Sequence, residues 1–141
     1  GGFDMHDFLV RDHPTQIGRV AEAMRAFYDT TAALGVADKV TAFTASDFGR
    51  TLTQKDDGSD HGWAATHLVV GGAVNGQRIY GTPPAIGHNT PDDVGQGRLL
   101  PTIAVDQYAA TLASWFGVSD SSLSTVLPNI GNYSTRNLGF V

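Results

Sequence analysis

Cysteine is absent from this chain of 141 residues. Its absence excludes disulfide bonds, thiolate metal ligands and a cysteine nucleophile. Any metal ion would therefore have to be held by carboxylate oxygen or imidazole nitrogen atoms. The absence carries no information about the cellular compartment.

Basic residues are scarce. Nine lysine and arginine residues stand against 14 aspartate and glutamate residues, which gives a formal net charge of -5. No run of lysine or arginine forms the basic face that a phosphate backbone requires. We therefore expect no nucleic-acid partner.

Long apolar runs are also missing. No stretch approaches the roughly 18 residues that a membrane-spanning helix needs, and the N-terminal GGFDMHDF lacks the charged and apolar regions of a signal peptide. The hydrophobic fraction of 41% is ordinary for a globular protein, and the length suits one domain over residues 1–141. A start on Gly-Gly, followed at once by an Asp/His cluster, leads us to expect a fragment of a longer domain.

Helical and extended patterns alternate in the first third of the chain. His13-Pro14 predicts the start of an amphipathic helix, and Gly35 predicts its end. The apolar face of this helix recurs every three or four positions and consists of Ile17, Val20, Met24, Phe27, Tyr28, Thr31 and Leu34. Residues 39–45 then predict a buried central strand that runs into the polar loop Ser46-Asp47-Phe48-Gly49. Because open α/β sheets build their sites where strands end, we expect a site near Asp47.

The remaining elements are predicted from turn signals and periodicity. Residues 53–62 read as a polar loop. Asn75-Gly76 predicts a hairpin over residues 69–80 with Val74 opposite Gln77, because both residues tolerate the positive φ of a tight turn. Residues 82–97 predict a surface loop, and residues 105–116 predict a second helix that ends at Gly117. The buried face of this helix is predicted to consist of Val105, Tyr108, Ala109, Leu112, Trp115 and Phe116.

Three loop segments carry residues suited to metal binding. They contain Asp4 with His6, Asp47 at the strand end, and Asp60 with His61. Carboxylate and imidazole are the ligands that zinc and manganese accept, and carboxylate also suits calcium. Spacing alone equally allows aspartates that close turns and ordinary histidines.

An ordered series of short motifs resembles a known family. The segments are GGFDMH, FTASDFGRT, GSDHGW, GGAVNGQRIYG, LLPTIAVDQYAATLASWFGV and LPNIGNY. In this order they are similar to the signatures of the bacterial domain-of-unknown-function family 1501 (DUF1501), over nearly the whole chain. The family resembles the alkaline phosphatase and sulfatase superfamily, so the resemblance implies an α/β fold: the C-terminal part of a doubly wound sheet, with a β-hairpin.

The resemblance also implies roles for individual residues. Asp4, His6, Asp47 and His61 would bind one or more divalent ions of zinc, manganese or calcium, with Asp60 a further ligand or a partner of His61. Phe48 departs from the pattern, because it stands where the superfamily often has a second ligand and its side chain cannot bind metal. Arg50 could hold a small anionic substrate, although a salt bridge to a neighbouring aspartate is the commoner role of such a residue.

Two functions from different classes follow from the resemblance. The first is a metal-dependent hydrolase of phosphate or sulfate esters, exported through a twin-arginine signal to the periplasm or beyond. Its nucleophile would lie in an N-terminal half of the parent protein, so the catalytic residues stay unassigned and we expect residues 1–141 alone to be inactive. The second is a non-catalytic exported binding or assembly module that keeps the same fold. A serine, threonine or cysteine shortly after a buried strand upstream would favour the enzyme.

Overall fold

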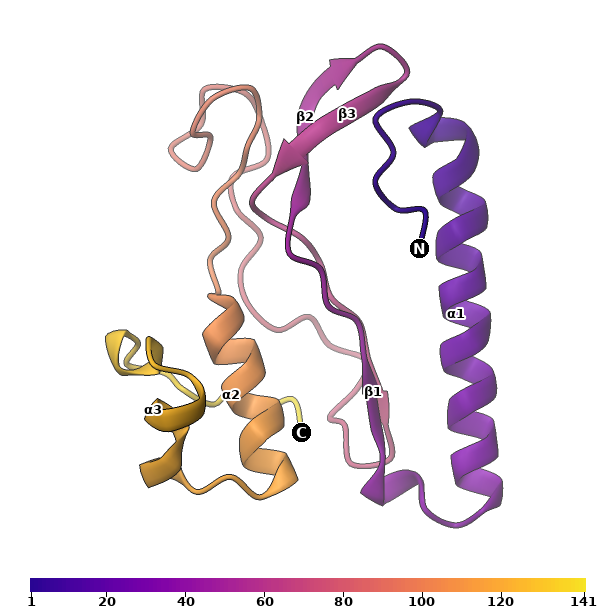
Figure 1. The fold of residues 1–141 in the computed structure, drawn as a ribbon, viewed down its shortest axis with the longest axis vertical. Coiled ribbons are helices and arrows are strands. Elements are labelled where there is room, and N and C mark those ends of the chain that lie inside the picture. The colour runs from indigo at the N-terminus through magenta and orange to yellow at the C-terminus, as the bar shows by residue number, and fades with distance from the viewer. The chain divides into compact units, whose positions relative to one another are not determined.

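The computed structural model describes residues 1–141, which form two compact units. Unit 1 contains residues 1–73 and 83–101, and unit 2 contains residues 74–82 and 102–141. The chain is an α/β protein with two small antiparallel sheets (Figure 1). None of its helices is long and apolar enough to cross a bilayer.

Unit 1 opens with a long helix, α1, which covers Leu9–Ala33. The predicted start at Pro14 is wrong, because the helix begins five residues earlier and Pro14 lies inside it. The earlier start is explained by a distant partner: the backbone N–H groups of Phe8 and Leu9 donate to the carboxylate (2.6 Å) and the carbonyl (3.1 Å) of Asp57. These bonds satisfy N–H groups that a helix start otherwise leaves unpaired.

The predicted end of α1 at Gly35 is confirmed. Gly35 has φ +70° in the left-handed region, where a residue without a side chain is favoured. Its N–H donates to Ala32, and the N–H of Val36 donates to Thr31, which together make a Schellman motif. Of the predicted apolar face, Val20, Met24, Tyr28 and Thr31 are covered at least in part, whereas Ile17, Phe27 and Leu34 are exposed.

The strand predicted over residues 39–45 is shorter than expected. A 3₁₀ turn, η1 (Ala37–Lys39), precedes β1 (Thr41–Phe43), which pairs antiparallel with β4 (Val69–Gly71). Since this sheet has two strands, β1 is not a central strand. Asp47 lies in a bend beyond the strand and is exposed.

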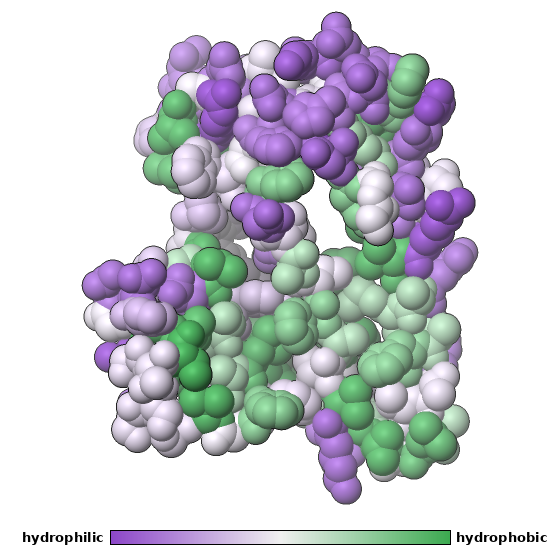
Figure 2. Space-filling model, viewed as in Figure 1, coloured by the Kyte–Doolittle hydropathy of each residue, from purple (hydrophilic) through white to green (hydrophobic).

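A second antiparallel pair occupies residues predicted to form a loop. β2 (Gly49–Lys55) and β3 (Gly58–Gly62) form a hairpin that turns at Asp56-Asp57, so the loop prediction for residues 53–62 is wrong. Much of the hairpin is exposed, so its polar residues can face water while the backbone pairs as strands. The loop prediction, which rested on polar composition, failed for this reason. Figure 2 shows a predominantly hydrophilic surface at the end of the unit where this hairpin lies.

The hairpin predicted over residues 69–80 is also wrong. β4 ends at Gly71, residues 77–80 belong to no strand, and Val74 is not paired with Gln77. In unit 2, Asn75 instead binds the C-terminal segment. Its backbone N–H donates to the carbonyl of Phe140 (2.9 Å) and its side-chain amide donates to the carbonyl of Gly139 (3.0 Å).

Helical elements dominate unit 2. α2 (Val105–Phe116) ends at Gly117 with φ +105°, as the sequence predicts, and is followed by η2 (Asp120–Ser122), α3 (Leu123–Val126) and η3 (Ile130–Asn132). The core consists of Ala110, Leu123 and Ile130, which are almost completely buried. Val105 and Phe116, predicted on the buried face of α2, are exposed.

Candidate metal centre

Three side chains from two parts of unit 1, the N-terminal segment and β3, converge on one point. Asp4 Oδ1 lies 3.0 Å from His6 Nε2 and 2.9 Å from His61 Nε2, and the two Nε2 atoms are 3.2 Å apart. Asp4, His6 and His61 thus form a triangle of one carboxylate oxygen and two imidazole nitrogens. We call these residues the Asp4–His6–His61 cluster.

The hairpin and the N-terminal segment hold the cluster together. Met5, between the two N-terminal donors, is buried and anchors this segment. His61 comes from β3, opposite Arg50 of β2. Gly58 allows the two segments to approach closely, because a Cβ atom at this position would lie 2.0 Å from the carbonyl oxygen of His6.

The charges of the cluster favour an ionised carboxylate. The hydrogen bond with His61, followed by the one from Arg50, lowers the pKa of Asp4 below its usual value of 3.8. The side chains of Asp4, His6 and His61 are exposed by 54%, 41% and 46%. An ion or substrate from solution can therefore reach them.

Asp60 lies beside the cluster rather than within it. Its Oδ1 accepts the backbone N–H of His61 at 2.8 Å and lies 4.0 Å from His6 Nδ1, on the ring edge away from the cluster. The hydrogen bond from the His61 backbone lowers the pKa of Asp60. Asp60 is therefore no donor of the cluster, and its carboxylate binds the backbone of His61 and not the imidazole ring that was its expected partner.

Asp47, the fourth expected ligand, does not lie in the cluster. The following residue, Phe48, is part of the site in another way, because its ring stacks on the ring of His61 with centroids 4.0 Å apart and an interplanar angle of 11°. Sequence reasoning recognised that Phe48 cannot bind metal. No signal in the sequence indicated that it would pack against a ligand.

Arg50 uses its guanidinium group within the site. Nη2 donates to Asp4 Oδ1 (2.6 Å) and to the carbonyl of Phe3 (3.1 Å), and Nη1 donates to the carbonyl of Ser59 (2.8 Å). The structure thus shows the ion pair with an aspartate that was the alternative to substrate binding.

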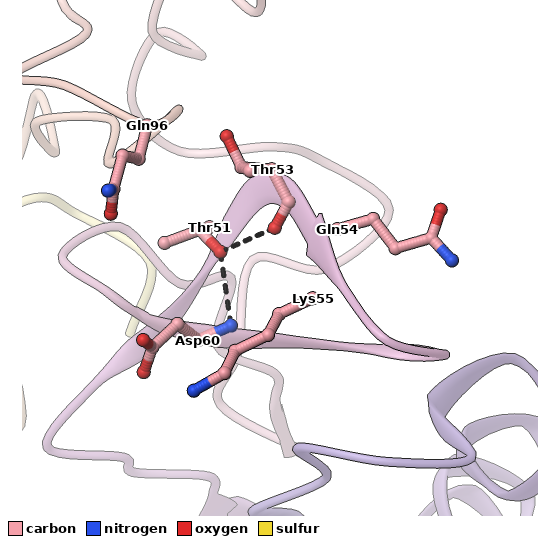
Figure 3. Close-up of a pocket in the computed structure, with 6 residues that line it drawn as sticks. All are labelled: Thr51, Thr53, Gln54, Lys55, Asp60 and Gln96. Atoms are coloured by element: carbon pink, nitrogen blue, oxygen red, sulfur yellow. Dashed lines mark hydrogen bonds between the residues drawn. The ribbon is translucent and has the colours of Figure 1, made fainter.

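A polar cavity of about 320 Å³ adjoins the hairpin (Figure 3). It is lined by Thr51, Thr53, Gln54, Lys55, Asp60 and Gln96. The hydroxyl of Thr51 accepts the N–H of Asp60 and donates to the carbonyl of Thr53, which fixes one wall. Asp60 therefore borders the cavity and, through its carboxylate, also lies next to His6.

These features define an α/β protein with a candidate metal centre. The chain belongs to the family described as "Protein of unknown function (DUF1501)", whose sequence model matches residues 1–127. The resemblance found in the sequence motifs is thereby confirmed at the level of the family. No curated protein and no solved structure matches the chain.

Proposed function

We propose that the Asp4–His6–His61 cluster binds a divalent metal ion and that the complete protein uses it to hydrolyse a phosphate or sulfate ester. The observation that carries the proposal is the convergence of three donors separated by up to 57 residues. One donor atom from each of these residues lies within 4.8 Å of the other two.

The size and chemistry of the triangle support this assignment. A tetrahedral zinc ion with bonds of about 2.0 Å holds its ligand atoms about 3.3 Å apart. The cluster's three distances of 2.9, 3.0 and 3.2 Å are close to that value. Two imidazoles with one carboxylate suit zinc or manganese, whereas calcium prefers a shell of oxygen atoms.

Three protein ligands also leave room for a reacting group. A zinc ion with two histidines and one carboxylate keeps an open position, from which it supplies Lewis-acid chemistry to a bound oxygen. Asp4, His6 and His61 would hold the ion, Arg50 would fix the carboxylate of Asp4, and Asp60 would orient the ring of His6. The adjoining polar cavity would receive the polar part of a small anionic substrate.

The wider assignment rests on the family resemblance. We propose that the cluster is one edge of an alkaline-phosphatase-like site in a doubly wound sheet, completed by an N-terminal half that supplies the nucleophile. Export of the parent protein to the periplasm or beyond belongs to the same proposal. These points rest on the resemblance of the family to that superfamily, and the family itself is matched over residues 1–127.

A non-catalytic binding module is the second candidate. The observation in its favour is Phe48, which occupies a position where the superfamily often has a ligand and packs on His61 instead. A site with fewer ligands can retain a structural ion without turnover.

Metal titration of the complete protein tests the proposal. Zinc, manganese and calcium are titrated calorimetrically into the wild type, His61→Ala and Asp47→Ala. We expect zinc and manganese to bind the wild type, His61→Ala to weaken binding more than about 100-fold, and Asp47→Ala to bind normally, since Asp47 is outside the cluster.

Turnover is then measured with p-nitrophenyl phosphate and p-nitrophenyl sulfate. Metal-dependent hydrolysis that disappears in His61→Ala supports the hydrolase. Metal binding without hydrolysis of either ester favours the binding module. Equal metal affinity in the wild type and His61→Ala contradicts both forms of the proposal.

A further inference from the structure

The turn of the β2–β3 hairpin makes an unusual set of contacts with the N-terminal segment. Asp57, at the turn, accepts two consecutive backbone N–H groups: that of Phe8 on its carboxylate at 2.6 Å and that of Leu9 on its carbonyl at 3.1 Å. Phe8 has a left-handed φ of +56° and immediately precedes α1. A single residue of the hairpin thus fixes the point where the N-terminal segment enters the helix.

The next residue, Gly58, lies against the backbone of the same segment. An added Cβ would meet the carbonyl oxygen of His6 at 2.0 Å and the backbone nitrogen of Asp7 at 2.8 Å. Both obstructing atoms belong to the backbone, so they could not yield by rotating a side chain. Gly58 has no positive φ, so its role lies in this close approach and not in its conformation.

On its other strand, the hairpin holds the beginning of the segment. Arg50 donates to the carbonyl of Phe3 at 3.1 Å and to the carboxylate of Asp4 at 2.6 Å. The two N-terminal donors of the cluster therefore lie between one attachment at Arg50 and another at Asp57. His61, the third donor, belongs to the hairpin itself.

We propose that Asp57 is a positioning residue: its hydrogen bonds to Phe8 and Leu9, together with the backbone approach at Gly58, hold Asp4 and His6 against His61 and so set the metal affinity of the cluster. Asp57 touches none of the three donors and acts through the backbone of residues 6–9. The part that concerns metal affinity rests on the proposed function, whereas the positioning of His6 against His61 does not.

Substitution at the turn tests this role. Zinc is titrated into the complete protein and its variants. We expect Asp57→Ala to raise the Kd for zinc about 10-fold, as expected for loss of a group that orients ligands. Asp57→Asn keeps a side-chain oxygen that accepts the Phe8 N–H and should bind zinc within about twofold of the wild type.

Two further variants separate positioning from other effects. Asp56→Asn removes a charge from the same turn and retains a residue type that tolerates the φ of +54° at this position, so its affinity should remain that of the wild type. Gly58→Ala should weaken zinc binding as Asp57→Ala does, because it displaces the His6 backbone by a different route. Wild-type affinity in both Asp57→Ala and Gly58→Ala overturns the proposal.

A metal-free measurement keeps the positioning testable if zinc does not bind. In the wild type, the His6 and His61 rings lie with centroids 4.9 Å apart, which predicts nuclear Overhauser contacts between them. We expect these contacts to be lost in Asp57→Ala and kept in Asp57→Asn. Their loss in Asp57→Ala supports the positioning role even when the proposed function fails, whereas their persistence in that variant overturns it.

Discussion

One oxygen atom organises the candidate centre at the scale of single residues. Asp4 Oδ1 lies within 3.0 Å of Arg50 and both histidines, so a single carboxylate joins a permanent cation to two potential ligands. The hydrogen bond with His61, and then the one from Arg50, lower the pKa of this carboxyl group, and the planar guanidinium also orients it. A carboxylate held in this way loses little freedom when it binds an ion, which favours affinity.

Phe48 provides a test of how closely His61 is oriented. Stacked aromatic pairs contribute about 0.5–1.5 kcal/mol beyond their buried area. Phe48→Leu keeps an apolar side chain and loses the stack on His61, so we expect zinc affinity to fall by about 2- to 12-fold. Trp63→Leu is the matched control, because Trp63 is 66% exposed and directly follows β3, the strand that contains His61. Equal zinc affinity in Phe48→Leu and the wild type would show that the stack does not orient the ligand.

The β2–β3 hairpin is the element on which the site depends. Its register is irregular between Arg50 and Gln54, so three residues of β2 lie opposite a single residue of β3. Two of the extra N–H groups, those of Leu52 and Thr53, donate to the carbonyls of Gly97 and Gln96 in the long loop. The bulge therefore finds partners away from its own sheet and forms one side of the polar cavity.

Two glycines, Gly18 within α1 and Gly35 just after it, should respond in opposite ways to substitution by alanine. Gly35→Ala places a side chain at φ +70° and should lower the free energy of unfolding by about 1 kcal/mol. Gly18 lies inside the helix, where an added Cβ would meet nothing within 4 Å, so Gly18→Ala should raise it by about 0.5–1 kcal/mol. Urea unfolding of both variants measures the difference, and a change of the same sign in both would contradict the assigned helix end.

Local signals predicted those elements that depend on local chemistry. Gly35 and Gly117 end their helices where expected, because the left-handed conformation that closes these two helices is a local property that glycine adopts readily. The Asn75-Gly76 signal failed because Asn75 bonds to residues 139 and 140, a contact that no local pattern reveals. The early start of α1 was missed for the same reason, since its partner is Asp57.

The sequence predicted the types of residue in the candidate centre, but only some of the residues that it selected belong to the cluster. Asp4, His6 and His61 were selected as possible ligands from their chemistry and a resemblance, and they converge. Asp47 was selected by the rule that sites form where strands end, but β1 is a short strand in a two-stranded sheet, and it is Phe48, the residue after Asp47, that contacts the cluster. Asp57 and Gly58 carried no signal because their roles are backbone contacts across about 50 residues of sequence.

At the scale of the whole molecule, the candidate centre and the helical core belong to different units. All three donors lie in unit 1, whereas Ala110, Leu123 and Ile130 lie in unit 2. Leu123 is 2% exposed and packs within this small core. A substitution that destabilises the core of unit 2 can therefore be distinguished from one that disrupts the candidate metal centre.

Leu123→Ala tests this separation. Loss of a buried leucine side chain costs about 2–5 kcal/mol, so amide hydrogen exchange in unit 2 should become faster. Zinc affinity, measured calorimetrically on folded protein, should stay within about twofold of the wild type. Val126→Ala is the control, because Val126 lies in the same helix as Leu123 but is 56% exposed. A large loss of zinc affinity in Leu123→Ala alone would show that the two units are coupled.

Acid should weaken unit 1 through its carboxylates. The pKa values of Asp4, Asp12, Asp60 and Asp93 are all lowered from 3.8, and all four residues belong to unit 1. The pKa of Asp93 is lowered by the backbone N–H of Asn89 and then by those of Gly95 and Gly97, at distances of 2.8, 2.8 and 2.9 Å. A carboxyl group with a lowered folded pKa stabilises the protein above its unfolded pKa, and this contribution is lost as the pH falls through the folded value.

Asp93→Asn measures one part of that dependence. In urea unfolding followed by residue-resolved NMR, the free energy of unfolding of unit 1 should decrease from about pH 5 to about pH 3 in the wild type. The variant cannot gain a proton at position 93, so its free energy of unfolding should be lower near neutral pH and should change less over the same interval. If Asp93→Asn keeps the wild-type slope, the three N–H groups around Asp93 do not stabilise its ionised form, and the acid sensitivity of unit 1 must come from the other three carboxylates.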